Sequence, residues 1–441
     1  MDTEKTTSIT TLTHGEVDEG IVDEFGVCYS VEGKRLLRCL NKDDELLEYY
    51  VHEGTEVICD KAFRGCHIGK VVLPDSVTCI GVSAFRKSAI ESIVLPDSVT
   101  RIGDRAFSYC KKLLSVVFSN TLTEISDSAF VECTSLSSVV LPHSVTKIAN
   151  SAFVRCSNLS SIAIPNSVTE IGENAFSECS RLKSVTIPNS VTHIGKYVFY
   201  DCQSLVSINI SNSIVELSEG FARNCTSLQS VVIPKLTTSI GNNAFKECIS
   251  LDSVTMSSTV TSIGWSAFRG CISLSELVFP ESLEAIGGLA FYDCINLSSV
   301  KFSHSLKVIG KDAFRGCRSL NSVAIPDSVS EIGSGAFCGC SRLSSVRLSN
   351  QMPLIGEFLF HGCQNLQSIH LPKSVLEIGV CAFAGCSRLK EIVLSDYLTK
   401  IDNFAFVDCS NLGRLALPSS VTYIGKDAFL DCKKQIVKQK K

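Results

Sequence analysis

The sequence predicts an α/β repeat solenoid in which each 23-residue coil supplies one short parallel strand and one short helical turn. The first observation is a cysteine that recurs with a spacing of 23 residues from Cys110 to Cys432, and Cys66 and Ser88 extend the series upstream with a spacing of 22. The second is a fixed set of apolar positions in every copy. The third is a phenylalanine that occupies the same slot in sixteen of seventeen copies, from Phe63 to Phe429.

The copy between Cys156 and Cys179 predicts the elements of one coil. Leu159, Ile162 and Ile164 recur as in a short strand with one buried face. Pro165 then ends the strand, because proline cannot donate to a strand ladder. We expect a short helical turn at Ala175–Phe176.

No single copy can bury its own apolar face, so neighbouring copies must stack. We therefore expect a column of phenylalanine rings along the array. Phe221–Ala222 is the exception to this column, since the two residues are exchanged there. The predicted structural core of a coil consists of Leu159, Ile162, Ile164, Phe176, Cys156 and Cys179.

The 22 cysteines fit three kinds of chemistry. Stacked strands about 4.8 Å apart lie within disulfide range at Cα, but side chains at equivalent positions point the same way, which disfavours a bridge. Zinc sites are commonly built from paired C-x₂-C motifs, and the chain offers only Cys338–Gly339–Cys340 as a close pair. A column of buried, reduced thiols that act as small apolar side chains fits the repeat best, while some disulfides or a metal site stay open.

The pattern L-x-x-I-x-I-P-x-S-V-T-x-I-G-x-x-A-F-x-x-C resembles the BspA-like, Treponema-type class of leucine-rich repeat, from about Cys59 to Cys432. The segment Phe25–Leu40 resembles the hairpin that often begins such arrays. The resemblance implies a right-handed leucine-rich-repeat solenoid with a non-enzymatic interaction role. Many relatives are cell-surface proteins implicated in adhesion to host or matrix components.

The overall composition excludes several partner classes. A net charge of -4 and a pI near 6.1 give no broad basic field, so we expect no nucleic-acid partner. No secretory signal is apparent in MDTEKTTSITTLTHGEVDEG, and no run approaches the roughly 18 apolar residues of a spanning helix. We expect no membrane insertion, a monomer, and either a cytoplasmic location or non-classical export to the cell surface.

The histidines and glycines suggest no enzyme. Most histidines of the array occupy different slots of the repeat, and no catalytic motif lies in a suitable strand–helix setting. We therefore predict no catalytic residues, no cofactor and no metal site.

Charged residues gather at strand positions that face solvent in the later copies. We call the following six residues the recognition strip, and predict that they bind a ligand: Glu276, Lys301, Arg347, His370, Glu391 and Arg414. The same residues also fit ordinary exposed strand positions, which tolerate any polar side chain.

We predict four segments along the chain. Residues 1–24 form an acidic disordered segment, 25–58 a capping hairpin with the first repeat, 59–432 the solenoid, and 433–441 a basic tail with no further strand. The predicted function is a non-enzymatic recognition scaffold that binds a protein or glycan ligand through the solenoid faces, with an adhesin-like role. An intracellular protein-interaction scaffold is the alternative.

Overall fold

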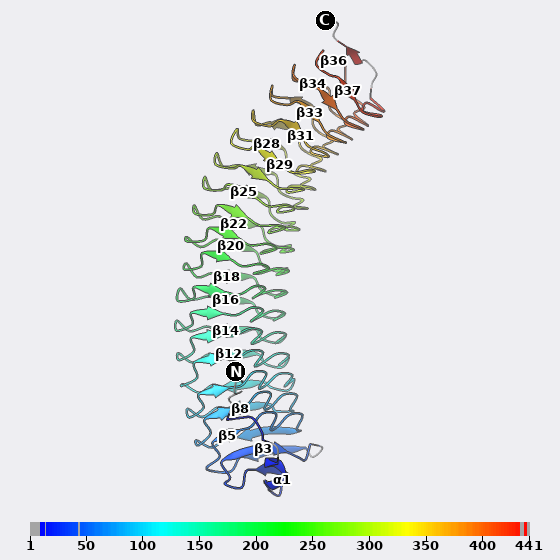
Figure 1. Ribbon diagram of the computed structural model, residues 1–441. Helices are drawn as coiled ribbons and strands as arrows, with labels where there is room; N and C mark the ends of the chain where they lie inside the picture. The colour runs from blue at the N-terminus through cyan, green and yellow to red at the C-terminus, as the bar shows by residue number, and fades with distance from the viewer. Residues whose placement is uncertain (1–8, 14, 43–44, 433–435, 439–441) are drawn as a thin grey trace, which may run out of the picture. The chain divides into compact units, whose positions relative to one another are not determined.

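The computed structural model describes residues 9–13, 15–42, 45–432 and 436–438. The chain forms two compact units, Met1–Ile214 and Val215–Lys441. Each unit is a stack of coils, and the strands of successive coils lie one above another in parallel (Figure 1). A typical coil carries two strands, one of three residues and one of two, where the sequence predicts only the first.

The first unit begins with α1 (Glu16–Glu19), β1 (Ile21–Val22), β2 (Val27–Tyr29) and β3 (Arg35–Cys39). The longer strand of each following coil is β4 (Leu46–Tyr50), β6 (Ile68–Val72), β8 (Ser92–Val94), β10 (Ser115–Val117), β12 (Ser138–Val140), β14 (Ser161–Ala163), β16 (Ser184–Thr186) and β18 (Ser207–Asn209). The two-residue strands are β5 (Val57–Ile58), β7 (Cys79–Ile80), β9 (Arg101–Ile102), β11 (Glu124–Ile125), β13 (Lys147–Ile148), β15 (Glu170–Ile171) and β17 (His193–Ile194).

The second unit repeats this arrangement. Its longer strands are β20 (Ser230–Val232), β22 (Ser253–Thr255), β24 (Glu276–Val278), β26 (Ser299–Lys301), β28 (Ser322–Ala324), β30 (Ser345–Arg347), β32 (Ser368–His370), β34 (Glu391–Val393), β36 (Leu415–Leu417) and β38 (Ile436–Lys438). The two-residue strands are β19 (Glu216–Leu217), β21 (Ser239–Ile240), β23 (Ser262–Ile263), β25 (Ala285–Ile286), β27 (Val308–Ile309), β29 (Glu331–Ile332), β31 (Leu354–Ile355), β33 (Glu377–Ile378), β35 (Lys400–Ile401) and β37 (Tyr423–Ile424).

The predicted helical turn in each coil is wrong, since α1 is the only helix in the part of the chain that the structure describes. The amide N–H of Phe176 donates to the carbonyl of Val198 in the next coil (3.0 Å), whereas that of Ser177 donates to Asn174 in its own coil (3.1 Å). An α-helix would use every amide within the helix. Asn174 and Glu178 also have positive φ angles of 55° and 60°, which a right-handed helix does not contain.

The phenylalanine rings form a buried stack in each unit. From Phe63 to Phe199, neighbouring ring centroids lie 5.1 to 5.7 Å apart and the rings are nearly parallel. From Phe245 to Phe429 the centroid spacing is 5.2 to 6.0 Å. These separations are typical of offset aromatic stacking. The exchanged ring of Phe221 is also fully buried but meets Phe245 at 72°.

The other predicted core residues of the copy between Cys156 and Cys179 lie mostly inside. Both cysteines, Leu159 and Phe176 are fully buried, and Ile162 is 9% exposed. Ile164 is only half-buried. The strand between Leu159 and Ile164 presents Ser161 and Ala163 to solvent, in accordance with its period of two.

All 22 cysteines are free thiols, and most of those in the regular array also donate a hydrogen bond to a backbone carbonyl. The Cys156 thiol donates to the carbonyl of Phe130 in the preceding coil (3.1 Å), and Cys271 donates in the same way to Phe245 (3.2 Å). Each of these carbonyls already accepts the amide N–H of the cysteine in its own coil. The repeated thiol thus fills space and supplies a second donor to a buried carbonyl oxygen. At Ser88 the hydroxyl lies 3.4 Å from the Cys110 thiol, so serine takes this position with a different polar contact.

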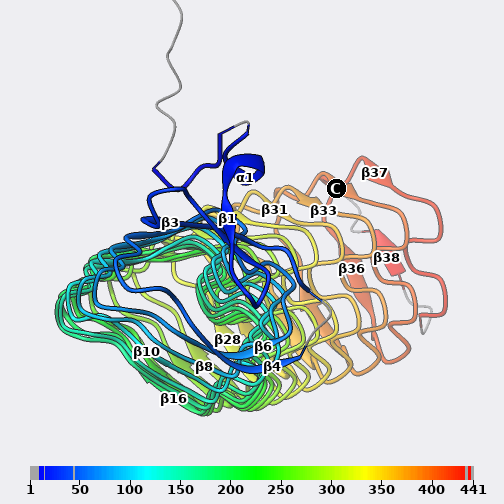
Figure 2. The same ribbon diagram turned by 90° about the horizontal axis from the view of Figure 1, so that it is seen from below.

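The N-terminal end of the first unit is covered by irregular elements (Figure 2). Strands β2 and β3 form an antiparallel hairpin within Phe25–Leu40, where the sequence predicts one, and β3 pairs in parallel with β5. Leu12 and Val17 pack on an apolar cluster that includes Leu37. Helix α1 and strand β1 thus lie within the segment predicted to be disordered, although the predicted boundaries themselves stay predictions.

The C-terminal end of the second unit differs from the sequence prediction of no further strand. Strand β38 pairs in parallel with β36, with Leu415 opposite Ile436. The array therefore continues by one strand beyond Cys432. The remaining residues of the predicted basic tail, 433–435 and 439–441, lie outside the described residues.

We expect Phe268→Ala to destabilise the second unit by about 3–5 kcal/mol, because it removes a fully buried ring between Phe245 and Phe291. Urea unfolding followed by circular dichroism measures this change. Phe268→Leu, which keeps most of the apolar volume, should lower the urea midpoint less. An unchanged midpoint in the alanine variant would contradict a ring stack that contributes to stability.

We expect most thiols to resist alkylation in the folded protein at pH 8. Burial raises the pKa of the Cys156 thiol to about 12, so the reactive thiolate is scarce at that pH. Cys381 and Cys432 are only partly buried and should react first with iodoacetamide, as peptide mass spectrometry would show. Rapid native labelling of Cys156 or Cys271 would contradict the buried column, and labelling in urea provides the control.

Candidate functional site

The recognition strip lies on exposed strand positions of the second unit. Glu276 and Lys301 belong to the paired strands β24 and β26, and Arg347 belongs to β30. His370 and Glu391 lie on the paired strands β32 and β34, and Arg414 directly precedes β36. The side chains at these six positions are all exposed. The alternation of strand positions therefore places them on the exposed strand face of their coils.

Two members of the recognition strip line one surface depression of about 550 Å³. Lys301 and Arg347 share it with Asp327 and His304, and the guanidinium of Arg347 lies 3.8 Å from the Asp327 carboxylate. The pKa of Asp327 is lowered, chiefly because its carboxylate accepts a hydrogen bond from the amide of Asn350. The Asp327 carboxylate therefore stays ionised, and the depression offers both signs of charge to a polar ligand.

The depression also contains an unsatisfied polar group. The hydroxyl oxygen of Ser328 is buried and has no hydrogen-bond partner among the described residues. Ser190 and Ser374 occupy the same slot in other coils and also have no hydrogen-bond partner in the described part of the chain, so this feature is not specific to the depression. Glu276, His370, Glu391 and Arg414 do not line this depression. The structure thus brings together only part of the predicted recognition strip.

The first unit contains a larger hollow, of about 670 Å³, that sequence reasoning missed. We call it the notch. A 23-residue coil has two residues between its cysteine and the following leucine, as in Cys110–Leu113, whereas the two 22-residue coils have only one, at Cys66–Ile68 and Ser88–Ile90. The notch lies where these residues are missing, since His67 and Ala89 both line it.

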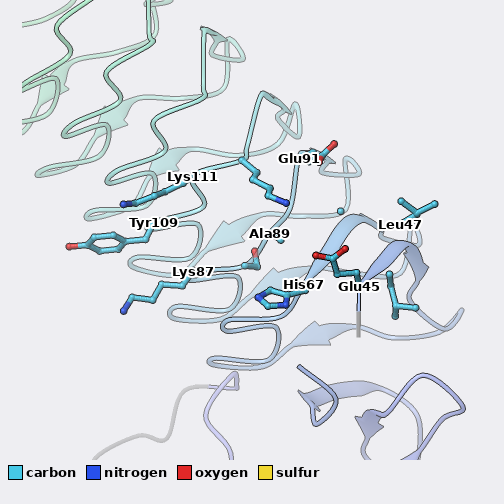
Figure 3. A pocket seen from close by; sticks show the side chains of 12 residues that line it. Glu45, Leu47, His67, Lys87, Ala89, Glu91, Tyr109 and Lys111 are labelled. Carbon is cyan, nitrogen blue, oxygen red and sulfur yellow. The ribbon is translucent and has the colours of Figure 1, made fainter. Parts of the chain in front are cut away.

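Opposite charges line the two sides of the notch. Lys87, Tyr109 and Lys111 lie on one side of Ala89, and Glu45 lies on the other (Figure 3). Lys112 and Glu91 complete the charged lining. The ammonium of Lys87 also lies 5.9 Å from the centre of the Tyr109 ring. The notch can therefore hold a polar ligand that carries anionic groups.

The signal for the notch was present in the sequence. The two spacings of 22 break an otherwise regular series of 23. The shortened loops of the two 22-residue coils leave a gap in the surface, because the loops of the neighbouring coils keep their full length. The sequence does not show which charged side chains line this gap, because the repeat does not fix the direction of loop side chains.

Neither a metal centre nor a spanning helix emerges from the described ranges. No group of three or more His, Cys, Asp or Glu side chains there is arranged to hold a metal ion. No helix in that part of the chain is long and apolar enough to cross a membrane.

Comparison with solved structures shows the same architecture in other proteins. A leucine-rich repeat protein from Bacteroides ovatus is 27% identical, with 95% of this chain and 96% of that chain covered and a TM-score of 0.67. A leucine rich cell surface protein from Faecalibacterium prausnitzii is 25% identical over 93% of each chain, with a TM-score of 0.43. The comparison with curated proteins found no match.

The family described as "BspA type Leucine rich repeat region (6 copies)" matches residues 39–160, 146–274, 238–357 and 330–439. These overlapping matches cover most of the chain and include both units. Together with the stacked parallel coils, they establish a leucine-rich-repeat solenoid of the right-handed type. The chain belongs to the BspA type leucine-rich repeat family.

Proposed function

We propose that this chain is a non-enzymatic recognition scaffold that binds a protein or glycan ligand through the exposed strand face of its second unit. The observation that carries the proposal is the depression in which Lys301 and Arg347 meet Asp327. Charged side chains on stacked strands suit the recognition of an extended polar surface. Glu276, His370, Glu391 and Arg414 would extend the contact along neighbouring coils.

The chemistry of the depression favours binding over catalysis. His304 is paired with Glu281 at 3.2 Å, but its side chain is 84% exposed. Catalytic acids and bases commonly have a shielded environment that tunes their pKa values. Leucine-rich repeats of this family also generally act as interaction modules. These observations support a binding role without a cofactor.

The setting of the scaffold has two candidates. The family resemblance supports an adhesin-like role at the cell surface. The free thiols support an intracellular interaction scaffold, since reducing compartments keep thiols reduced. Their burial weakens this second argument, because a shielded thiol in a packed column also resists oxidation outside the cell. We favour the surface role.

Protease treatment of intact source cells tests the location. If the chain is displayed outside, an antibody against it should lose its signal after trypsin treatment of intact cells, while a cytosolic marker keeps its signal. Lysed cells treated in the same way show that the folded chain can be cleaved. Protection in intact cells together with cleavage after lysis would contradict the surface role and support the intracellular scaffold.

The double variant Lys301→Ala/Arg347→Ala tests the binding face. Binding of the purified chain to an array of glycans and peptides should weaken at least about tenfold, since two charged contacts of about 1 kcal/mol or more each are lost. Arg388→Ala/Lys390→Ala removes the same charges from exposed positions of the same unit and should leave binding unchanged. Equal binding by both variants, or no selective binding by the natural chain, would contradict the proposal.

A further inference from the structure

The first coils of the first unit contain a second hollow whose charged lining is entirely basic. Its volume is about 330 Å³, and its lining consists of Arg38, Lys42, Lys61, Arg64, Gly65 and Lys87. We call it the basic hollow. Five cations from three successive coils thus surround this one small space.

Backbone hydrogen bonds fix the basic side chains beside one another. The amide of Cys39 donates to the carbonyl of Ala62 (2.7 Å), which holds Arg38 next to the turn that begins at Lys61. The amide of Gly65 donates to Arg86 (3.0 Å), which places the turn after Arg64 against the turn that carries Lys87. The cations therefore project from anchored turns, and their mutual repulsion is not relieved by moving the backbone apart.

Four described carboxylates of these coils are engaged elsewhere. Glu16 pairs with Arg35, Glu56 pairs with Lys34 at 2.8 Å, and Glu48 pairs with Lys70 at 2.6 Å. Asp60 accepts hydrogen bonds from the Val82 amide and from the Thr11 hydroxyl. Among the described residues, no carboxylate forms an ion pair with the five cations of the basic hollow. Asp43 and Asp44, which follow Lys42 in sequence, lie outside the described residues.

Later coils of the same unit neutralise the equivalent surface. Arg155 stands three coils beyond Lys87 in the slot before the cysteine, and its guanidinium contacts Glu178 at 2.8 Å and Glu132 at 3.3 Å. Both glutamates occupy that slot in the adjacent coils. The repeat can therefore carry side chains of alternating charge in this slot of successive coils. The first coils differ from this pattern.

The basic hollow continues into the notch. Lys87 lines both, and the notch adds the cations Lys111 and Lys112 together with the carboxylates Glu45 and Glu91. The ammonium of Lys111 also lies 3.8 Å from the Glu132 carboxylate. The first unit thus presents a track of seven cations: Arg38, Lys42, Lys61, Arg64, Lys87, Lys111 and Lys112. A linear polyanion could pair with the cations of this track, most directly with the five of the basic hollow, whose lining contains no carboxylate.

We propose that this basic track binds a linear sulfated polysaccharide. Sulfate groups suit a mixture of lysine and arginine, because guanidinium forks bind tetrahedral oxyanions in the same way as they bind phosphate. Tyr109 distinguishes this ligand from single-stranded nucleic acid, which needs free aromatic faces for base stacking. Arg86 and Lys87 already cover the Tyr109 ring, at 5.5 and 5.9 Å from its centre. The site lies in the first unit, and the proposal does not depend on the recognition strip of the second.

Binding of the full-length chain to immobilised heparin at about 150 mM NaCl tests the proposal. Lys61→Gln/Arg64→Gln/Lys87→Gln should weaken binding at least tenfold and lower the dependence of log Kd on log salt by about two to three, as counterion release predicts. The control Arg181→Gln/Lys183→Gln/Lys390→Gln removes the same charges from exposed positions elsewhere. It should bind as the natural chain does.

The other outcomes decide against the proposal. No heparin binding by the natural chain, equal loss in both triple variants, or equal affinity for desulfated heparin would each overturn it. Tighter binding to a single-stranded DNA oligonucleotide than to heparin, with loss in the first triple variant, would assign the track to nucleic acid instead. Circular dichroism of both variants separates lost binding from lost structure.

Discussion

The structure depends on hydrogen bonds that run from each coil to the next. Amides of the turn alternate between a carbonyl of their own coil and a carbonyl one coil further on, as Phe176 and Ser177 show. Half of these amide donors bond to a carbonyl of the next coil. Neither the turn nor the strands of a coil therefore form without a neighbouring coil. The rings and thiols stack at the same repeat distance, so polar and apolar interactions impose one common spacing.

The repeat could be predicted from the sequence because one pattern, copied many times, averages out local ambiguity. The strand at Ser161–Ala163, the ring stack and the buried cysteines follow from periodicity alone. The helical turn was predicted wrongly because Ala175 has a high helix propensity and no proline interrupts residues 173–179. Its neighbours Asn174 and Glu178 adopt positive φ angles, which residue type alone does not specify.

The candidate sites could also be predicted from the sequence only in part. The repeat predicted that Lys301 and Arg347 face solvent, since strand positions alternate. It did not predict that Asp327 and Ser328, which belong to the following bend, complete a depression around them. The basic track was not predicted from the sequence, because the net charge of -4 is summed over the whole chain, whereas seven cations gather on a few coils.

The exchange at Phe221–Ala222 leaves the backbone pattern intact, because Phe221 donates to Ser218 and Ala222 donates to Ala244, as the regular alanine and phenylalanine do in other coils. Its consequence concerns how the chain folds. Nearly identical coils can pair one repeat out of alignment at little energetic cost, so a perfectly uniform array would have many competing alignments. The exchanged ring of Phe221 meets the Phe245 ring at 72° instead of stacking in parallel, so a shifted alignment would lose this contact. Together with the two 22-residue coils, it marks positions along the array, and these irregular copies give the native alignment its energetic advantage.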